Sequence, residues 1–287
     1  NSELGVCLLR ARDEFKSIEI AHKLDDLNKK RRLLTSELEK SVIGQIEKNI
    51  NVNNNIIPNA IVVSGKDFHE GIIGIVAGRM KELYNRPVCV IAINKDGICK
   101  GSGRTVNGIP LGDIILEASK LKIINSGGGH DMAAGFTIKE GKIDELCEFL
   151  IKKVDLLMNN EIPKVIHFAA SVIPISGCTI ELAEWLEDLG PWGIGMEEPK
   201  FIIPNAKISS LRKFGSSKEH ISFYISDRSS KKLKIKKFNI LNSPLNKIFD
   251  NYENVNLSFL GRLNIDTWNN SKSLEMMLDD IIYADVT

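Results

Sequence analysis

The chain has 287 residues, of which 43% are hydrophobic and 26% are charged, and its formal net charge is +1. This composition is typical of a folded globular protein with room for two domains, and it excludes an intrinsically disordered chain. The longest wholly apolar run, residues 71–78, is far shorter than the roughly 20 residues that a membrane-spanning helix needs, so we expect no contact with a membrane.

The five cysteines contain no CxxC pair, and with the five histidines they assemble no familiar metal-ligand spacing. We therefore expect reduced, buried thiols, no metal bound by this chain, and a cytoplasmic location. The first residue is Asn1 rather than Met, so we expect the chain to be a portion of a longer protein.

A long amphipathic helix is predicted for residues 17–48. Its apolar residues recur at the spacing of one helix face, at Ile20, Leu24, Leu27, Leu34, Leu38, Val42 and Ile46. A helix of this span would be about 48 Å long, which is longer than a small domain. We interpret residues 17–58 as a connecting helix followed by an asparagine-rich linker at 49–58.

Residues 59–160 alternate between strand-like and helix-like patterns, which predicts an α/β domain. Strands are expected at 60–63, 87–93, 97–105 and 135–138, and helices at 71–84, 111–121 and 142–158. Because ligand-binding loops of such sheets gather at strand ends, we expect Arg104 and His130 to lie at one edge of the sheet.

Two glycine-rich segments of this domain form a candidate phosphate site. Gly127, Gly128 and Gly129 precede His130, and successive glycines allow positive φ values and a close approach of N–H groups to an anion. Ser102 and Arg104 lie in the second segment, and an arginine suits bidentate recognition of phosphate. Each segment alone could be an ordinary turn or a solvated strand end, but two such segments in one domain favour a shared anion site.

Residues 161–287 are rich in short strand-like runs, at 165–172, 201–211, 221–225, 233–238, 255–263 and 274–282, and only 179–189 looks helical. This pattern predicts a small all-β barrel such as an OB-fold. Residues 205–240 carry ten basic and two acidic residues, a balance of +8, whereas residues 250–287 carry two basic and seven acidic residues, a balance of −5. The basic block indicates a polyanionic partner.

Strand alternation in residues 232–236 puts Leu233 and Ile235 on one face and Lys232, Lys234 and Lys236 on the other. We predict that these three lysines line a groove for a single-stranded nucleic acid. The aromatic residues that could stack on bases, each with a core position as the alternative, are Phe214, Phe223, Tyr224, Phe238 and Trp268.

Four motifs together resemble the RecJ family of single-stranded-DNA-specific exonucleases, which are DHH/DHHA1 phosphoesterases. The motifs are His69–Arg79, Gly101–Arg104, Gly128–Gly135 and Leu189–Gly193, and their order matches the family over nearly the whole chain. The resemblance implies a tail of a DHH domain at 1–16, the connecting helix and linker at 17–58, a DHHA1 domain at 59–160 and an OB-fold domain at 161–287.

The resemblance also implies the C-terminal half of a 5′→3′ exonuclease in DNA repair and recombination. His130 would be catalytic at the scissile phosphate, while Arg104 would contact the DNA backbone. Mn²⁺ or Mg²⁺ would be bound by the DHH domain, and because this sequence contains no Asp-His-His string, we expect the chain alone to be inactive. The expected partners are single-stranded DNA and a single-stranded-DNA-binding protein, with the chain itself a monomer.

Two alternatives stay open at this point. The chain could bind single-stranded nucleic acid without any chemistry, or it could belong to a DHH/DHHA1 phosphodiesterase of short oligonucleotides. The basic block at 205–240 argues against the second alternative, because a small substrate needs no extended groove.

Overall fold

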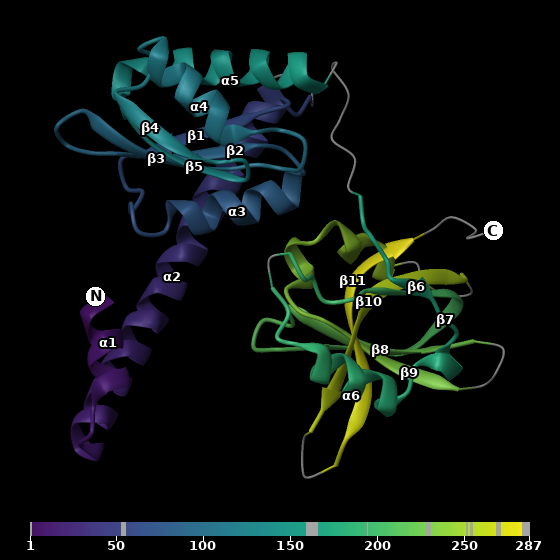
Figure 1. Cartoon of the computed structure of the whole chain (residues 1–287). Helices are drawn as coiled ribbons and strands as arrows, with labels where there is room; N and C mark the ends of the chain where they lie inside the picture. The colour runs from purple at the N-terminus through teal and green to yellow at the C-terminus, as the bar shows by residue number, and fades with distance from the viewer. Residues whose placement is uncertain are drawn as a thin grey trace. The chain divides into compact units, whose positions relative to one another are not determined.

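The computed structural model describes residues 2–52, 56–158, 166–193, 195–227, 231–250, 252, 255–267 and 271–282. The chain divides into two compact units, residues 1–165 (unit 1) and 166–287 (unit 2) (Figure 1). None of the described helices is long and apolar enough to cross a membrane.

Unit 1 begins with the helices α1 (Ser2–Arg10) and α2 (Glu14–Val52). Asp13 caps α2, because its carboxylate accepts a hydrogen bond from the N–H of Lys16 at 2.8 Å. The helix has 39 residues and is longer than predicted. Residues 49–52, which we expected in the linker, form its last turn because Ile50 packs against the core of the unit, and residues 53–55 lie outside the described residues.

A five-stranded sheet forms the centre of unit 1, with the strand order β1-β2-β3-β5-β4. The strands are β1 (Ile61–Gly65), β2 (Val88–Ile93), β3 (Ile98–Arg104), β4 (Ser126–His130) and β5 (Ala133–Lys139). β1 and β2 are parallel, and the other neighbours are antiparallel. A short 3₁₀ helix, η1 (Glu140–Lys142), follows β5.

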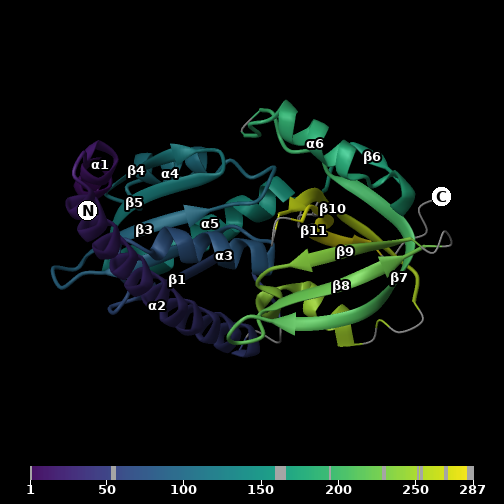
Figure 2. The ribbon, with the colours of Figure 1, turned by 90° about the horizontal axis from the view of Figure 1, so that it is seen from below.

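Helices cover both faces of this sheet (Figures 1 and 2). α3 (Ile73–Tyr84) and the C-terminal half of α2 pack on one face, where Val88, Val90 and Ala92 of β2 are buried. α4 (Leu111–Lys120) and α5 (Ile143–Met158) pack on the other face, against Cys89 and Ile91. The predicted α/β domain with a preceding long helix is thus confirmed.

The glycine-rich segment before His130 is not the loop that the sequence suggested. Gly127, Gly128 and Gly129 lie in β4 and none of them has a positive φ. β4 pairs with β5 through the two-residue turn Asp131-Met132, so His130 and Ala133 face each other across the hairpin. The prediction failed because glycine disfavours strands in isolation, whereas here tertiary packing requires it, as described below.

Unit 2 contains a closed barrel. Its strands are β7 (Phe201–Phe214), β8 (His220–Ser226), β9 (Lys232–Lys237), β10 (Leu257–Asp266) and β11 (Ser273–Ile282). The sheet order is β10-β11-β9-β8-β7, β10 also pairs with β7, and β9 and β11 are parallel. This topology confirms the predicted OB-fold.

Shorter elements surround the barrel. β6 (Ser171–Val172) pairs with the start of β7, and α6 (Ile180–Leu189) follows the turn η2 (Ile175–Gly177). Two 3₁₀ segments, η3 (Ile240–Asn242) and η4 (Pro244–Asp250), connect β9 to β10. Of the strand predicted at 165–172, only Ser171 and Val172 are a strand, and residue 165 lies outside the described residues.

The cysteines agree only in part with the expectation of buried thiols. All five are free; Cys89 and Cys99 are buried, Cys147 and Cys178 are half-buried, and Cys7 is exposed. Burial raises the pKa of the Cys89 thiol to about 12, so this thiol stays protonated at neutral pH. The prediction was wrong for Cys7, which lies on the outer side of α1.

Candidate nucleic-acid interface

Arg104 and His130 lie in one row across three strands of unit 1. Arg104 of β3 is paired with Ala133 of β5, and Ala133 is paired with His130 of β4. Directly paired residues of antiparallel strands point to the same face, so both side chains project from the same side of the sheet. Two strand spacings separate their Cα atoms by about 10 Å, a gap that two long side chains can bridge around a phosphodiester.

The first turn of α3 lies against Ser102 and Arg104. A Cβ atom on Gly74 would be 2.9 Å from Oγ of Ser102 and 3.2 Å from a terminal nitrogen of Arg104, so a larger residue here would displace the ends of these two side chains. The N-cap residue Ile72 makes no side-chain hydrogen bond to the first turn. The positive end of the α3 dipole therefore adds to the charge of the guanidinium.

Neutral groups hold the side chain of Arg104 in place. One terminal nitrogen donates to the carbonyl of Gly103 at 2.8 Å and to Oγ of Ser102 at 3.2 Å. Since neither partner is a carboxylate, the guanidinium keeps its full positive charge. An arginine oriented in this way can bind a phosphate with its remaining donors.

His130 is exposed, and a backbone hydrogen bond orients its ring. Nδ1 accepts a hydrogen bond from the N–H of Met132 at 3.3 Å. In the neutral imidazole this arrangement leaves the proton on Nε2, which becomes a donor. Both Arg104 and His130 thus offer N–H groups on one face, as a phosphoryl oxygen requires.

The three glycines before His130 have different reasons to be glycine. A Cβ on Gly127 would come within 2.8 Å of Ile115 and Phe136, and one on Gly129 would come within 2.1 Å of the carbonyl oxygen of Ala133. At Gly128 a Cβ would meet only Cδ2 of Leu116, at 3.9 Å. Gly127 and Gly129 are therefore needed for packing, whereas Gly128 leaves open space on the face that carries His130.

The backbone of β4 also offers donors. Flanking a two-residue turn, His130 and Ala133 form a hydrogen-bonded pair, so by alternation the N–H groups of Gly127 and Gly129 point away from β5. β4 is the edge strand of its sheet. We call Ser102, Arg104, His130 and the open position Gly128 the β3–β4 face; Figure 2 views unit 1 from the α3 side.

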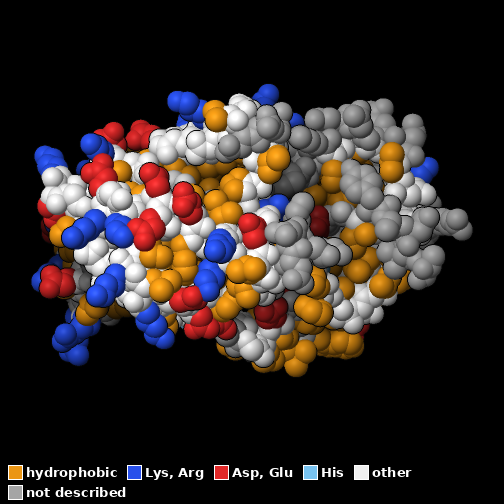
Figure 3. Space-filling model, turned by 90° about the horizontal axis from the view of Figure 1, so that it is seen from above, with side chains coloured by type: hydrophobic (Ala, Val, Ile, Leu, Met, Phe, Trp, Pro, Cys, Tyr) orange, Lys and Arg blue, Asp and Glu red, His pale blue; other side chains and the backbone are white. Residues whose placement is uncertain are grey.

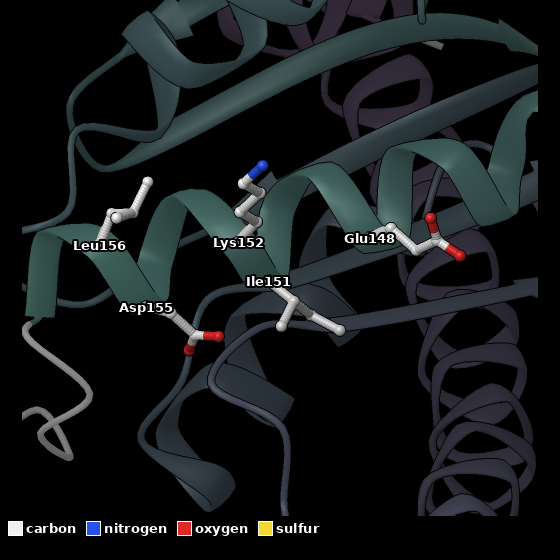
Figure 4. Close-up of a pocket in the computed structure, with 5 residues that line it drawn as sticks. All are labelled: Glu148, Ile151, Lys152, Asp155 and Leu156. Carbon is white, nitrogen blue, oxygen red and sulfur yellow. The ribbon is translucent and has the colours of Figure 1, made fainter.

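The opposite face of the sheet has a different character. On the side that carries α4 and α5, acidic and basic side chains are intermixed (Figure 3). Among them, Nζ of Lys153 is paired with Glu117 at 2.5 Å. α5 also bears a shallow hollow of about 380 Å³, lined by Ile151 and Leu156 together with the charged side chains of Glu148, Lys152 and Asp155 (Figure 4). This hollow has no link to Arg104 or His130.

In unit 2 the alternation predicted for β9 is present. Leu233 and Ile235 are buried in the barrel, and Lys232, Lys234 and Lys236 lie on its outer face. Lys232 is exposed, whereas the other two lysines are only partly exposed. The outer face continues onto β8, where Tyr224 is paired with Lys234 and is 40% exposed.

Two of the three lysines are engaged by acidic residues. Nζ of Lys236 is 2.7 Å from Glu275 and 3.0 Å from Asp266, and Nζ of Lys234 is 3.7 Å and 3.8 Å from the same carboxylates. Burial alone would lower the pKa of Lys236, but hydrogen bonds and attraction from Glu275 and Asp266 outweigh it and raise this pKa. Lys234 and Lys236 therefore share their charge with acidic neighbours, and the role of the three lysines in a groove for nucleic acid stays a prediction.

Sequence reasoning missed these acidic partners because they belong to the block at 250–287, which it treated separately. The parallel pairing of β11 with β9 places Glu275 opposite Lys234. The signal was available in the opposite signs of the two blocks, +8 and −5. Gly74 was likewise overlooked, although Gly74 and Gly78 are spaced as neighbours on one helix face.

The predicted stacking residues divide into three groups. Phe223 is fully buried in the barrel core, and Phe214 and Phe238 form an edge-to-face cluster with His220, with centroids 4.9–5.9 Å apart. Tyr224 lies on the outer face beside the lysines. Trp268 lies outside the described residues.

No group of three or more His, Cys, Asp or Glu side chains in the described part of the chain is arranged to hold a metal ion. The donors of the β3–β4 face are a guanidinium, a hydroxyl, an imidazole N–H and backbone N–H groups. Such a set fits an anion and does not fit a divalent cation, which prefers oxygen acceptors.

The DHHA1 domain family matches residues 57–155, and the RecJ OB domain family matches residues 170–280. The single-stranded-DNA-specific exonuclease RecJ of Bacillus subtilis is 29% identical over 96% of this chain and 34% of its own length. The same enzyme of Haemophilus influenzae is 30% identical over 78% of this chain and 39% of its own length. The chain thus spans between a third and two fifths of these relatives.

Solved structures show the same fold. The crystal structure of RecJ from Thermus thermophilus in complex with Mg²⁺ matches with a TM-score of 0.73 and 21% identity, over 99% of this chain and 41% of that one. A second structure of the same protein, in complex with Mn²⁺, matches with a TM-score of 0.72 and 21% identity, over 99% of this chain and 39% of that one. The two domain matches and the curated relatives together show that this chain belongs to the RecJ family and carries its DHHA1 and OB domains.

Proposed function

We propose that this chain is the strand-binding part of a 5′→3′ single-stranded-DNA exonuclease that acts in DNA repair and recombination in the cytoplasm. The observation that carries the proposal is the row of Arg104, Ala133 and His130, with both donor side chains on the same face of the sheet. Membership in the RecJ family supports nuclease activity for the longer protein that contains this chain.

In this proposal the β3–β4 face binds one phosphodiester of the strand. Arg104 donates to its non-bridging oxygens, helped by Ser102 and by the first turn of α3. Gly128 leaves room for the sugar-phosphate backbone, and the outward N–H groups of Gly127 and Gly129 are further donors to the strand. No base edge is read here, so binding at this face is independent of sequence.

His130 is proposed as the catalytic residue. Its Nε2–H donates to the phosphoryl oxygen on which negative charge grows as the P–O bond breaks, and Arg104 stabilises the same charge. Hydrolysis of DNA by the intact enzyme would need a divalent cation such as Mn²⁺ or Mg²⁺, which would supply the hydroxide nucleophile. The donor set on this chain does not fit that ion, so we propose that a DHH domain of the longer protein supplies its ligands, and we expect this chain alone to be inactive.

The barrel is proposed to hold the strand away from the reacting phosphate. Lys232 and the partly neutralised Lys234 and Lys236 contact phosphates, while Tyr224 stacks on a base. A single-stranded-DNA-binding protein is the proposed protein partner, and the chain is proposed to be a monomer.

Binding of a 5′-fluorescein 20-mer by the purified chain, followed by anisotropy, tests the first step. We expect tighter binding of the single strand than of the duplex, and at least tenfold weaker binding by Arg104→Ala, because charge-assisted hydrogen bonds are worth about 1.5–3 kcal/mol. Lys120→Ala on α4 is the control, since it removes a cation from the opposite face. Equal affinity for a dinucleotide and the 20-mer would instead favour a phosphodiesterase of short oligonucleotides.

Degradation is tested by incubating the same oligonucleotide with Mn²⁺. We expect no cleavage by this chain and 5′→3′ cleavage by the longer protein that contains it. In that longer protein His130→Ala should lower kcat by about a hundredfold or more with little change in affinity. Cleavage by the chain alone would show that it holds its own metal ligands, and an equal loss of affinity and kcat would remove His130 from the chemistry.

A further inference from the structure

The sheet face that carries Arg104 continues along β3 and β5 and bears two further cations. Lys100 lies four residues before Arg104 in β3, so both side chains project from the α3 side of the sheet. Lys100 is paired with Thr137 of β5, and Ile98 is paired with Lys139. Since directly paired residues point to the same side, Lys100 and Lys139 share a face with the candidate phosphate site.

The charges of these two lysines are available to an anion. Within residues 56–158, all of which the structure describes, no carboxylate forms an ion pair with the ammonium of Lys100 or Lys139, and both side chains are exposed. Nζ of Lys100 donates to Oγ1 of Thr137 at 3.1 Å. A neutral group therefore orients Lys100, as neutral groups orient Arg104.

The acidic residues near this end of the sheet have partners of their own. Glu140 lies 3.9 Å from Nζ of Lys66, and Glu70 accepts a hydrogen bond from Nδ2 of Asn94 at 2.6 Å. Oδ1 of Asp96 accepts from a backbone N–H at 3.1 Å. These carboxylates are thus directed at donors other than the two lysines.

The surface between the arginine and the two lysines is open. Gly135 lies between Ala133 and Thr137 on β5 and is exposed. A Cβ atom there would meet only the carbonyl oxygen of Gly101, at 4.0 Å. Ser126, which is paired with Thr137, is exposed on the edge strand and adds a hydroxyl. A sugar-phosphate backbone can therefore lie directly on the sheet between the two cationic ends.

The separation of the two ends sets the length of the strand that fits. Four residues of a β-strand separate the Cα atoms of Arg104 and Lys100 by about 13 Å. This span corresponds to about four nucleotides of a stacked strand, at a rise of about 3.4 Å each, and to fewer nucleotides of an extended strand. A dinucleotide has one phosphodiester and cannot place a phosphate at each end.

We propose that this face binds a single strand over about three to five nucleotides, with one phosphate at Arg104 and another at Lys100 and Lys139. The hydroxyl oxygen of Thr137 accepts from Lys100 and keeps its O–H, which donates to the same phosphate. Because these contacts are made to phosphates alone, the face selects for strand length and not for sequence. This inference rests on the proposed phosphate site at Arg104.

Competition against a 5′-fluorescein 20-mer, followed by anisotropy, tests the second contact. We expect the double variant Lys100→Gln/Lys139→Gln to bind (dT)₈ about five- to tenfold more weakly and to lower the slope of log affinity against log salt by about 1.4, or about 0.7 for each lysine. The dinucleotide d(TpT) should compete weakly and equally with the variant and the wild type. Glutamine keeps a donor for Thr137, so we expect the Tm of the variant to stay near that of the wild type.

The matched control is Lys120→Gln/Lys152→Gln, which removes two exposed cations from α4 and α5 on the opposite face of the sheet. It should change the affinity for (dT)₈ by less than about twofold. A second measurement needs no variant. (dT)₈ should protect Lys100 and Lys139 of the wild type, but not Lys120, from acetylation by acetic anhydride, as read by peptide mass spectrometry.

Unchanged binding of (dT)₈ by the Lys100→Gln/Lys139→Gln variant would overturn the proposal, and so would acetylation of both lysines at the same rate with and without (dT)₈. Arg104→Ala separates this failure from a failure of the proposed function. If Arg104→Ala weakens binding in either case, the phosphate site at Arg104 stands and only the second contact is lost. If Arg104→Ala binds as the wild type does, the proposed phosphate site fails as well.

Discussion

A single methyl group at Gly129 or at Gly128 is expected to have opposite consequences. At Gly129 a Cβ would lie 2.1 Å from the carbonyl oxygen of Ala133 and 2.6 Å from Cα of Ala134. Both atoms belong to the backbone of β5, which is paired with β3 on one side and β4 on the other and cannot retreat. Overpacking costs about 1–3 kcal/mol, and we expect Gly129→Ala to reach about 3 kcal/mol because the clash is with backbone.

At Gly128 the same methyl would touch only Cδ2 of Leu116, at an ordinary 3.9 Å. The free energy of unfolding should therefore change little or rise slightly, because alanine restricts the unfolded chain by about 0.4–1 kcal/mol. The methyl would project into the β3–β4 face, where the proposed phosphodiester lies. We expect roughly a three- to tenfold loss of affinity for a single-stranded 20-mer, a fraction of a charge-assisted hydrogen bond.

The two variants are compared by thermal unfolding and by fluorescence anisotropy at one low salt concentration. For a unit of this size about 3 kcal/mol corresponds to a fall of roughly 6–12 °C in Tm, which we expect for Gly129→Ala alone. If Gly129→Ala has the same Tm as the wild type, the close approach of β4 to β5 does not require a glycine at this position. If Gly128→Ala melts normally and binds DNA as the wild type does, the β3–β4 face is not where the strand lies.

Four further outcomes follow from charged side chains of the two units. Lys232→Gln should lower the slope of log affinity against log salt by about one without affecting stability. Lys236→Gln should lower the free energy of unfolding, measured in urea, by about 2 kcal/mol, because it leaves the buried Glu275 carboxylate short of a partner. This cost is smaller than that of breaking a fully buried ion pair. The raised pKa of Lys236 contributes stability that is present below its unfolded pKa of about 10.4 and is lost as the pH rises through the higher folded pKa. Glu275→Gln should reduce this alkaline loss in urea titrations between pH 9 and 12, and Asp266, which also raises the pKa, should retain part of it. Arg79→Ala should destabilise unit 1 by about 1–3 kcal/mol, because Glu39 of α2 is 7% exposed and pairs with Arg79, and Glu39→Gln should reduce that cost in a double-mutant cycle.

The elements with strong periodicity were predictable from sequence. The alternation at 232–236 gave the correct faces of β9, and Thr179 before an apolar run marked the start of α6, where its Oγ1 accepts from the N–H of Leu182 at 3.1 Å. The strand β4 was not predictable in the same way, because Gly127 to Gly129 have no side chains from which a period can be read. Its pairing follows from the hairpin turn and from the small space beside Phe136.

The ion-pair partners of the barrel lysines also could not be predicted from the local sequence. Asp266 and Glu275 lie 30 or more residues from Lys236 in the chain, and only the closure of the barrel brings them within 3.0 Å of its ammonium. A count of charges along the chain gives the sign of a segment but not the partners of each side chain. The candidate site of unit 1 was easier to predict from sequence. Its two motifs end at Arg104 in β3 and at His130 in β4, and these two strands run in the same direction.

If the proposed sites bind the strand, the two units offer phosphate contacts of different strength. Arg104 is held by a hydroxyl and a carbonyl, so its whole charge is available to an anion, whereas Lys234 and Lys236 share two carboxylates. A phosphate that approaches these lysines has to compete with Glu275 and Asp266, which weakens each contact and shortens its lifetime. If the strand moves past the barrel after each cleavage, weak contacts there and a strong one at Arg104 favour movement over arrest, because the affinity is concentrated where the phosphodiester must be positioned.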